Sequence, residues 1–152
     1  MENILIPLLV VLVGWLVRIR YKEICQKREE FDKEYSNFAA PLFYFINAIQ
    51  DEKISLNASL LSEFNEHKFA KEIFIDSLSG GRLNSFNQKW AEYEEEYYQV
   101  KDLGILVAIA PSQEALGNAT HLDAEKWEVE RKRKIHAIIT ELLKISKRKI
   151  WL

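Results

Sequence analysis

One pair of residues has the spacing of an acid–base or metal-binding pair. Glu63 and His67 stand four positions apart in a predicted helix, so both side chains would lie on one face of it. A carboxylate and an imidazole placed in this way can share a proton or ligate a metal ion. The other histidines, His121 and His136, complete no H-x-x-x-H pair. A solvated polar face explains Glu63 and His67 equally well, and the sequence predicts no metal site, no cofactor and no catalytic residue.

A glycine pair next to an arginine is a second candidate for chemistry. Ser79-Gly80-Gly81-Arg82 offers backbone N–H groups that could hold a phosphate. The segment lacks the Lys-Ser/Thr ending of a P-loop, and no predicted strand precedes it. The end of one helix followed by the start of the next accounts for it entirely.

Basic residues gather near the end of the sequence, in Arg131–Lys134 and again in Lys144, Lys147, Arg148 and Lys149. Residues 123–152 carry 9 basic and 5 acidic side chains, whereas residues 51–102 carry 6 basic and 11 acidic ones. We interpret this as two oppositely charged elements that neighbour each other in one bundle. For Arg131–Lys134, a solvated face and proximity to anionic lipid are the main alternatives. Nucleic acid is not an expected partner, because the formal net charge is −2.

An apolar stretch at the N-terminus would determine where in the cell these residues lie. Ile4–Val17 contains fourteen residues without a charge, and Arg18, Arg20 and Lys22 follow it. With Met1–Asn3 and Ile19–Tyr21 the stretch reaches about twenty residues, the length of a bilayer-spanning helix. The sequence therefore predicts a transmembrane anchor within residues 1–22, with the span near residues 4–21.

Two alternatives to an anchor fit the same stretch less well. A cleaved signal peptide needs a basic start and a small-residue cleavage site, and neither is present. A buried core helix would tolerate Pro7 and Gly14 poorly. Eight residues are predicted to lie at the membrane interface, because aromatic and cationic side chains favour it: Trp15, Arg18, Arg20, Lys22, Lys147, Arg148, Lys149 and Trp151.

The distribution of charge around the stretch predicts its orientation. No Lys or Arg precedes the apolar run, and several follow it closely. The positive-inside rule then places residues 23–152 in the cytoplasm, as the domain of a single-pass protein of the cell inner membrane. The lone Cys25 agrees with a reducing compartment, where a disulfide partner has no use.

Residues 23–152 are predicted to form one all-α domain of about four helices. The anchor continues into Tyr21–Asn37, and the sequence leaves open whether Pro41 kinks one long helix or separates two. The next helix is expected from about Asn57, with a core face of Leu60, Leu61, Phe64, Ile73, Phe74 and Leu78, and Ser79-Gly80-Gly81 is expected to end it. Between Pro41 and about Gln50 a densely apolar helix is expected, with the apolar residues Leu42, Phe43, Phe45, Ile46 and Ile49.

The two remaining helices carry the clearest patterns. Leu83, Phe86, Trp90, Tyr93, Tyr97 and Val100 repeat at steps of three and four, which predicts a packed seam with Trp90 buried. Acidic Glu92, Glu94, Glu95 and Glu96 fall largely off that seam. In the last helix, capped by Asp123, the inner face is predicted to be Ile135, Ile138, Ile139, Leu142, Leu143 and Ser146. Between them, residues 105–110 are expected to be a buried extended or helical segment, a membrane-resting segment or a lone strand, and residues 111–122 a loop.

No motif names a reaction, so function rests on the layout. One short anchor followed by aromatic-rich helices resembles small bacterial and phage inner-membrane proteins. The sequence favours a membrane-tethered helical interaction or regulatory module, with the lipid bilayer and another protein at the membrane as its partners. An enzyme acting on lipid-borne or membrane-proximal substrates is the alternative. The only residues from which its active site could be built are Glu63, His67 and the other histidines.

Overall fold

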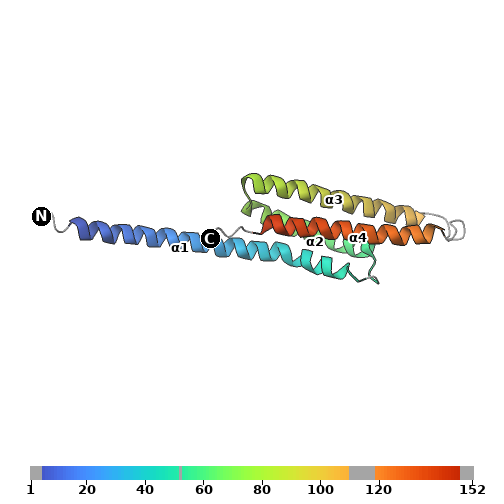
Figure 1. The fold of residues 1–152 in the computed structure, drawn as a ribbon, viewed down its shortest axis with the longest axis horizontal. Coiled ribbons are helices and arrows are strands. Elements are labelled where there is room, and N and C mark those ends of the chain that lie inside the picture. The colour runs from blue at the N-terminus through green and yellow to red at the C-terminus, as the bar shows by residue number, and fades with distance from the viewer. Residues whose placement is uncertain (1–4, 52, 110–118, 148–152) are drawn as a thin grey trace. The chain divides into compact units, whose positions relative to one another are not determined.

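The computed structural model describes residues 5–51, 53–109 and 119–147, and every element in these ranges is helical. The α-helices are α1 (Leu5–Ala48), α2 (Leu56–Phe74), α3 (Gly80–Ile109) and α4 (Ala119–Ser146), and a short 3₁₀ turn, η1 (Ile75–Ser77), follows α2 (Figure 1). The prediction of an all-α protein is therefore confirmed.

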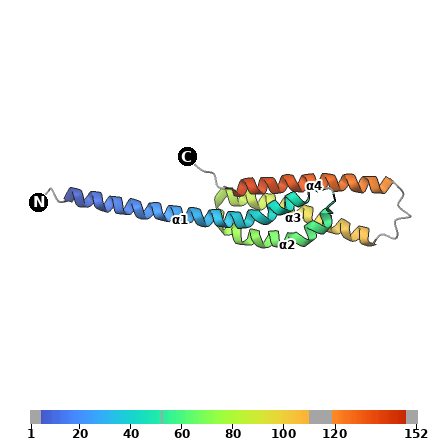
Figure 2. The same ribbon diagram turned by 90° about the horizontal axis from the view of Figure 1, so that it is seen from below.

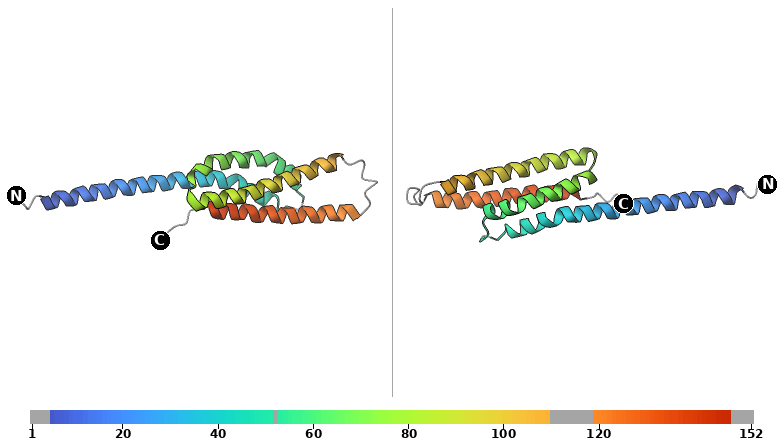
Figure 3. Two further views of the ribbon diagram at one scale, coloured as in Figure 1. Left: turned by 90° about the horizontal axis from the view of Figure 1, so that it is seen from above. Right: turned by 180° about the vertical axis from the view of Figure 1, so that it is seen from behind.

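The chain divides into two compact units, Met1–Glu34 and Tyr35–Leu152. Within the second unit, the last part of α1 and the helices α2, α3 and α4 form a four-helix bundle. Helices α3 and α4 run side by side in opposite directions, as the views in Figure 2 and Figure 3 agree. The expected bundle of about four helices is thus present, whereas the proposed division into residues 1–22 and 23–152 stays a prediction.

The transmembrane helix expected near residues 4–21 is not supported by the described part of the chain. None of the helices there is both long enough and apolar enough to cross a membrane. The described stretch without a charge, Leu5–Val17, has thirteen residues, which span about 20 Å. Arg18 and Arg20 then interrupt it.

Helix α1 answers the question that the sequence left open at Pro41. The helix continues through this proline to Ala48, so one long helix is present. Proline lacks the N–H that would bond to the carbonyl one turn earlier, and packing of the surrounding residues compensates for that loss. Phe38, Leu42 and Phe45 around it are all fully buried.

Helix α2 begins one residue earlier than predicted and ends well before the glycines. The backbone leaves the helix through η1, and Leu78 is extended. Gly80 then takes a φ of +57°, a left-handed conformation that glycine adopts without strain, and opens α3. Ser79-Gly80-Gly81 therefore starts the next helix, and the prediction that it ends α2 was wrong in that respect.

The core of the bundle is a connected cluster of aromatic rings. Phe38 stacks on Phe74 with 4.8 Å between ring centroids, and Phe86 lies 5.5 Å from Phe38 and 6.2 Å from Trp90. Trp90 is 2% exposed, so its predicted burial is confirmed. Offset and edge-to-face ring pairs of this kind stabilise a core beyond the area that they bury.

The predicted faces of the helices agree with the structure to different degrees. All six residues of the α4 face are buried, and four of the six seam residues of α3 are buried. Leu61 and Ile73, which the prediction placed on the core face of α2, are exposed. Each of them lies well off the line of buried residues on its helix, so apolar character alone misplaced them.

The region between α3 and α4 agrees with the prediction in part. Helix α3 continues to Ile109, so the helical alternative holds for residues 105–109 and the strand alternative does not. Helix α4 begins at Ala119, four positions before Asp123, which therefore does not cap it. Of the loop predicted over residues 111–122, residues 119–122 are helical and the others lie outside the described residues.

Candidate functional site

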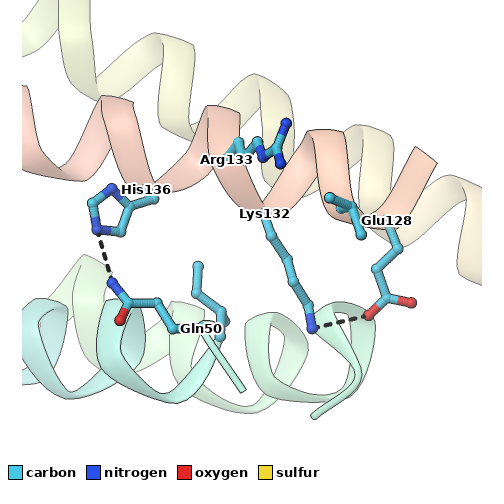
Figure 4. Close-up of a pocket in the computed structure, with 7 residues that line it drawn as sticks. Gln50, Glu128, Lys132, Arg133 and His136 are labelled. Carbon is cyan, nitrogen blue, oxygen red and sulfur yellow. Dashed lines mark hydrogen bonds and ion pairs between the residues drawn. The ribbon is translucent and has the colours of Figure 1, made fainter. Parts of the chain in front are cut away.

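A groove of about 510 Å³ lies in the bundle between the residues that directly follow α1 and the middle of α4. Its lining combines two apolar residues with polar and charged ones (Figure 4). The residues that line it are Ile49, Gln50, Glu128, Val129, Lys132, Arg133 and His136. The groove is therefore the candidate functional site of the second unit.

Two of the charged residues in the groove are occupied in holding the connection between α1 and α2. The Lys132 ammonium donates to the carbonyl oxygens of Ile54, at 2.6 Å, and Asp51, at 3.1 Å. The Glu128 carboxylate accepts the backbone N–H of Leu56 at 2.8 Å. Since Leu56 is the first residue of α2, this carboxylate also complements the positive end of that helix.

The remaining polar residues of the groove are more available. The His136 Nε2 and Gln50 Nε2 atoms lie 3.2 Å apart and can share a hydrogen bond. Figure 4 shows Lys132 reaching toward the α1–α2 connection and Arg133 directed away from it. Arg133 is exposed and has no hydrogen-bond or ion-pair partner in the described ranges. The groove can therefore offer one free cation and one imidazole to a ligand.

The pair Glu63 and His67 does come together, but not in the groove. His67 is fully buried, and its Nδ1 lies 2.8 Å from the hydroxyl oxygen of Tyr93. Its Nε2 is 3.9 Å from a Glu63 oxygen and has no hydrogen-bond partner among the described residues. The expectation of a solvated face was wrong for His67, because this residue lies in line with Leu60 and Phe64 on the buried side of α2.

Burial controls the ionisation of these groups. It lowers the pKa of His67 to about 4, against the weaker opposite influence of the Pro41 carbonyl. Burial, and then the charge of Glu66, raise the pKa of the Glu63 carboxyl. Burial also raises the pKa of the Tyr93 hydroxyl far above its usual range. At neutral pH His67 is therefore uncharged, and its contact with Glu63 is not an ion pair.

The basic run Arg131–Lys134 is divided among different tasks. Arg131 and Lys134 both donate to the carboxylate of Glu96, a residue of α3 that is 2% exposed. Burial alone would raise the pKa of Glu96, but hydrogen bonds from Lys134 and Arg131 hold this pKa below its usual value. These pairs join the acidic helix to the basic one, so the predicted neighbourhood of opposite charges is confirmed for α3 and α4.

A second ion pair between the same helices has the reverse polarity. Lys89 of α3 lies 2.8 Å from Glu141 of α4 and 2.7 Å from Glu92. The hydrogen bonds that Lys89 donates to Glu141 and Glu92 raise the pKa of Lys89, and the bond to Glu141 lowers the pKa of that carboxyl. Exposed pairs of this kind add little to stability, but they help to fix the pairing of the two helices.

The segment Ser79-Gly80-Gly81-Arg82, a candidate phosphate site in the sequence, has a different role in the structure. Arg82 donates to the carbonyl oxygen of Ser146 at 2.7 Å and to that of Ile145 at 3.4 Å. These carbonyls belong to the last turn of α4, where the helix leaves them without partners. Arg82 thus caps α4.

The residues predicted to lie at the membrane interface are described in part. Trp15 is 61% exposed, and the side chains of Arg18, Arg20 and Lys22 are exposed. Lys147 is exposed at the end of α4. Arg148, Lys149 and Trp151 lie outside the described residues, so the predicted contact of this end of the chain with a bilayer stays a prediction.

No other candidate site emerges in the part of the chain that the structure describes. There, no three histidine, cysteine, aspartate or glutamate side chains gather as metal ligands. Of the titratable groups that the enzyme alternative requires, His136 lines the groove, whereas Glu63 and His67 do not. The roles of Glu128 and Lys132 depend on contacts with residues more than seventy positions away, so no local sequence pattern predicts them.

Comparison of the chain with protein-family models, with curated proteins and with solved structures finds no match.

Proposed function

We propose that this chain is a membrane-tethered helical interaction module. The N-terminal part of α1 would anchor it in a bilayer, and the four-helix bundle would meet another protein at the same membrane. The observation that carries the proposal is the exposure of the apolar side chains near the start of α1. Leu8, Val10, Val11 and Trp15 are each more than 60% exposed, and every side chain from residue 7 to residue 24 is exposed.

The apolar surface of this segment surrounds the helix. Leu8, Leu9, Val10 and Val11 fill one complete turn and are all at least 60% exposed. A helix that lies flat on a membrane keeps a polar face toward water, and this segment has none. Apolar side chains in every direction instead suit a helix that enters the hydrocarbon along its own axis.

The length of the anchor depends on sequence that precedes the described part of α1. Met1–Tyr21 contains about twenty residues, the number that a bilayer requires. The long side chains of Arg18 and Arg20 would extend to the head groups while their stems stay among the lipids. Trp15 and Tyr21 match the preference of amphipathic rings for the interface.

The charges that follow the anchor support one orientation. Lys and Arg are concentrated on its C-terminal side, which is the side that the positive-inside rule assigns to the cytoplasm. The bundle would therefore lie at the inner face of a cell inner membrane. Confinement there raises the effective concentration of the bundle toward any other protein of that surface. A regulatory or inhibitory contact then needs little affinity of its own.

A single charge in the apolar segment tests the anchor. We expect the full-length chain to stay in the membrane fraction after washing with alkaline carbonate and to dissolve in detergent. Val11→Arg should shift much of the chain into the soluble fraction, because arginine at the centre of a span costs about 3 kcal/mol. Leu61→Arg, an equivalent change at an exposed position of α2, should leave the distribution unchanged. Release of the unmodified chain by carbonate would contradict the proposal.

The lone cysteine tests the orientation. Cys25 is partly exposed and free, so a membrane-impermeant maleimide can react with no other residue. In intact spheroplasts we expect no labelling, and after permeabilisation we expect full labelling. Cys25→Ser combined with the exposed Ser36→Cys should behave in the same way. Labelling of either chain in intact spheroplasts would place the bundle on the other side.

A further inference from the structure

Five cations follow the apolar segment of α1 within eleven residues. They are Arg18, Arg20, Lys22, Lys27 and Arg28, and we call them the cationic collar. One acidic residue, Glu23, lies among them. Its contact with Arg20 is 3.4 Å long, and the arginine side chain is 82% exposed. A solvent-exposed pair of this kind contributes little, so the collar keeps most of its positive charge.

The cations of the collar lie on opposite sides of the helix. Successive residues of an α-helix are rotated by about 100°, so Arg18 and Lys22 share one side, Arg20 and Lys27 lie on the opposite side, and Arg28 lies between the two. Their side chains are all exposed. A helix lying flat on a surface would have cations on one side. Cations on opposite sides of a helix, next to its apolar segment, suit a helix that passes through a layer of negative charge.

The spacing of the cations along the helix matches the thickness of that layer. Arg18, Arg20 and Lys22 span about 6 Å of helix, and one head-group layer is about 5–8 Å thick. Lys27 and Arg28 follow within a further 9 Å or so, about one Debye length at physiological salt. The net charge reverses beyond them, since residues 29–34 carry four acidic side chains and one basic one. The positive charge of unit Met1–Glu34 is thus concentrated directly beside its apolar segment.

We propose that the cationic collar binds the head groups of anionic phospholipids, so that the chain gathers these lipids around its anchor. This inference rests on the proposed membrane anchor and adds the class of lipid that the anchor selects. The negative charge of an anionic leaflet attracts each Lys or Arg near its surface, and in the collar five such attractions act together. Arginine also binds a lipid phosphate through two parallel hydrogen bonds.

Energy transfer from Cys25 tests the proposal, because this lone cysteine lies inside the collar. The full-length chain, with a fluorescent donor on Cys25, is reconstituted into phosphatidylcholine vesicles. These vesicles contain a trace of acceptor-labelled lipid, whose dye is on the acyl chain of either phosphatidylglycerol or phosphatidylcholine. We expect phosphatidylglycerol to be enriched around the protein by about fivefold over phosphatidylcholine. High salt should reduce this enrichment, because it screens the charges.

Replacing the three cations nearest the apolar segment provides the decisive comparison. Arg18→Gln, Arg20→Gln and Lys22→Gln together should bring the transfer to the two lipids close to equality. Lys53→Gln, Lys68→Gln and Lys126→Gln remove the same charge from exposed positions of the bundle and should retain the enrichment. Equal transfer to both lipids in the unmodified chain would overturn the collar proposal and leave the anchor intact. Failure of the chain to enter vesicles of either kind would overturn both.

Discussion

The Nδ1 atom of His67 lies 2.8 Å from the hydroxyl oxygen of Tyr93, and this contact joins α2 to α3 inside the aromatic core. Either ring tautomer can make the bond, because Nδ1 can accept from the hydroxyl or donate to it. The rings of Phe45 and Tyr93 lie 5.2 and 6.0 Å from the imidazole. A protonated imidazole would have to exist among these rings without water, so the core holds His67 in its neutral form.

Acidification should therefore destabilise the bundle within a defined pH range. The pKa of His67 is about 4 in the folded chain and about 6.5 in the unfolded one, so the unfolded state binds the proton more readily. Stability is fully present above pH 6.5 and is lost as the pH falls toward 4, by up to about 3 kcal/mol. Chemical unfolding of the full-length chain at pH 7, 6 and 5 measures this slope.

The matched variant for this prediction is His67→Gln. Glutamine can still form a hydrogen bond with Tyr93 and does not titrate, so the slope between pH 6.5 and 5 should largely disappear. The lowered pKa of Glu96 confines its loss of stability to lower pH, and the raised pKa of Glu63 acts with the opposite sign to His67. Both carboxyls are present in His67→Gln, so the difference in slope between the two chains reports on His67. An unchanged slope in His67→Gln would show that another group senses the acid.

Removing both partners of the His67–Tyr93 bond should cost less than removing either one. His67→Leu leaves the Tyr93 hydroxyl buried without a partner, and Tyr93→Phe leaves Nδ1 unpaired, so each change alone should cost about 1–3 kcal/mol. In the double variant no polar group is stranded, and its cost should lie well below the sum of the two. Unfolding free energies of the four chains give the coupling. Additive costs would mean that the hydrogen bond contributes nothing.

The buried carboxylate of Glu96 should be important for the pairing of α3 and α4. Glu96→Gln preserves the shape of the side chain and removes the charge that Arg131 and Lys134 share. Because both cations are partly exposed and regain water, we expect a loss of about 1–3 kcal/mol. Glu95→Gln, the neighbouring exposed position, should change the unfolding free energy by less than about 0.5 kcal/mol. Similar costs for the two variants would contradict this role.

Lys132 should be required for the connection between α1 and α2. Lys132→Met keeps most of the stem and removes the ammonium that donates to the Asp51 and Ile54 carbonyls. We expect a loss of about 1–3 kcal/mol and faster hydrogen exchange at the Leu56 amide. Arg133→Met is the adjacent control, and its exchange rates should match those of the unmodified chain. Unaltered exchange at Leu56 in Lys132→Met would refute the assignment.

Local pattern was sufficient to predict the inner faces of the last two helices. The alternating spacing of three and one in α4 predicts all six buried residues, because an apolar stripe at helical period has one way to face a core. The same reasoning succeeds for Phe86, Trp90 and Tyr93 in α3. Where apolar residues are adjacent, as at Leu60 and Leu61, the pattern cannot choose, since a single step along the helix rotates the side chain by about 100°.

The polar residues inside the bundle were harder to predict, although they occupy core positions. His67 follows Phe64 by three residues, and Glu96 follows Tyr93 by three, so both continue a buried stripe. A charge at such a position is expected to face water unless a partner is known. For Glu96 the partners come from α4, and for His67 the partner comes from α3. Their burial therefore depends on tertiary pairing.

The way in which Lys132 and Glu128 hold the α1–α2 connection has a consequence for the order of folding during synthesis. The groups that satisfy Asp51, Ile54 and Leu56 lie 81, 78 and 72 residues further along the chain. While the ribosome is still translating α3, the turn between the first two helices has no partner for these backbone groups. The hairpin of α1 and α2 can then reach its final structure only after α4 has been synthesised. Until that point its aromatic side chains remain accessible to other segments of the chain.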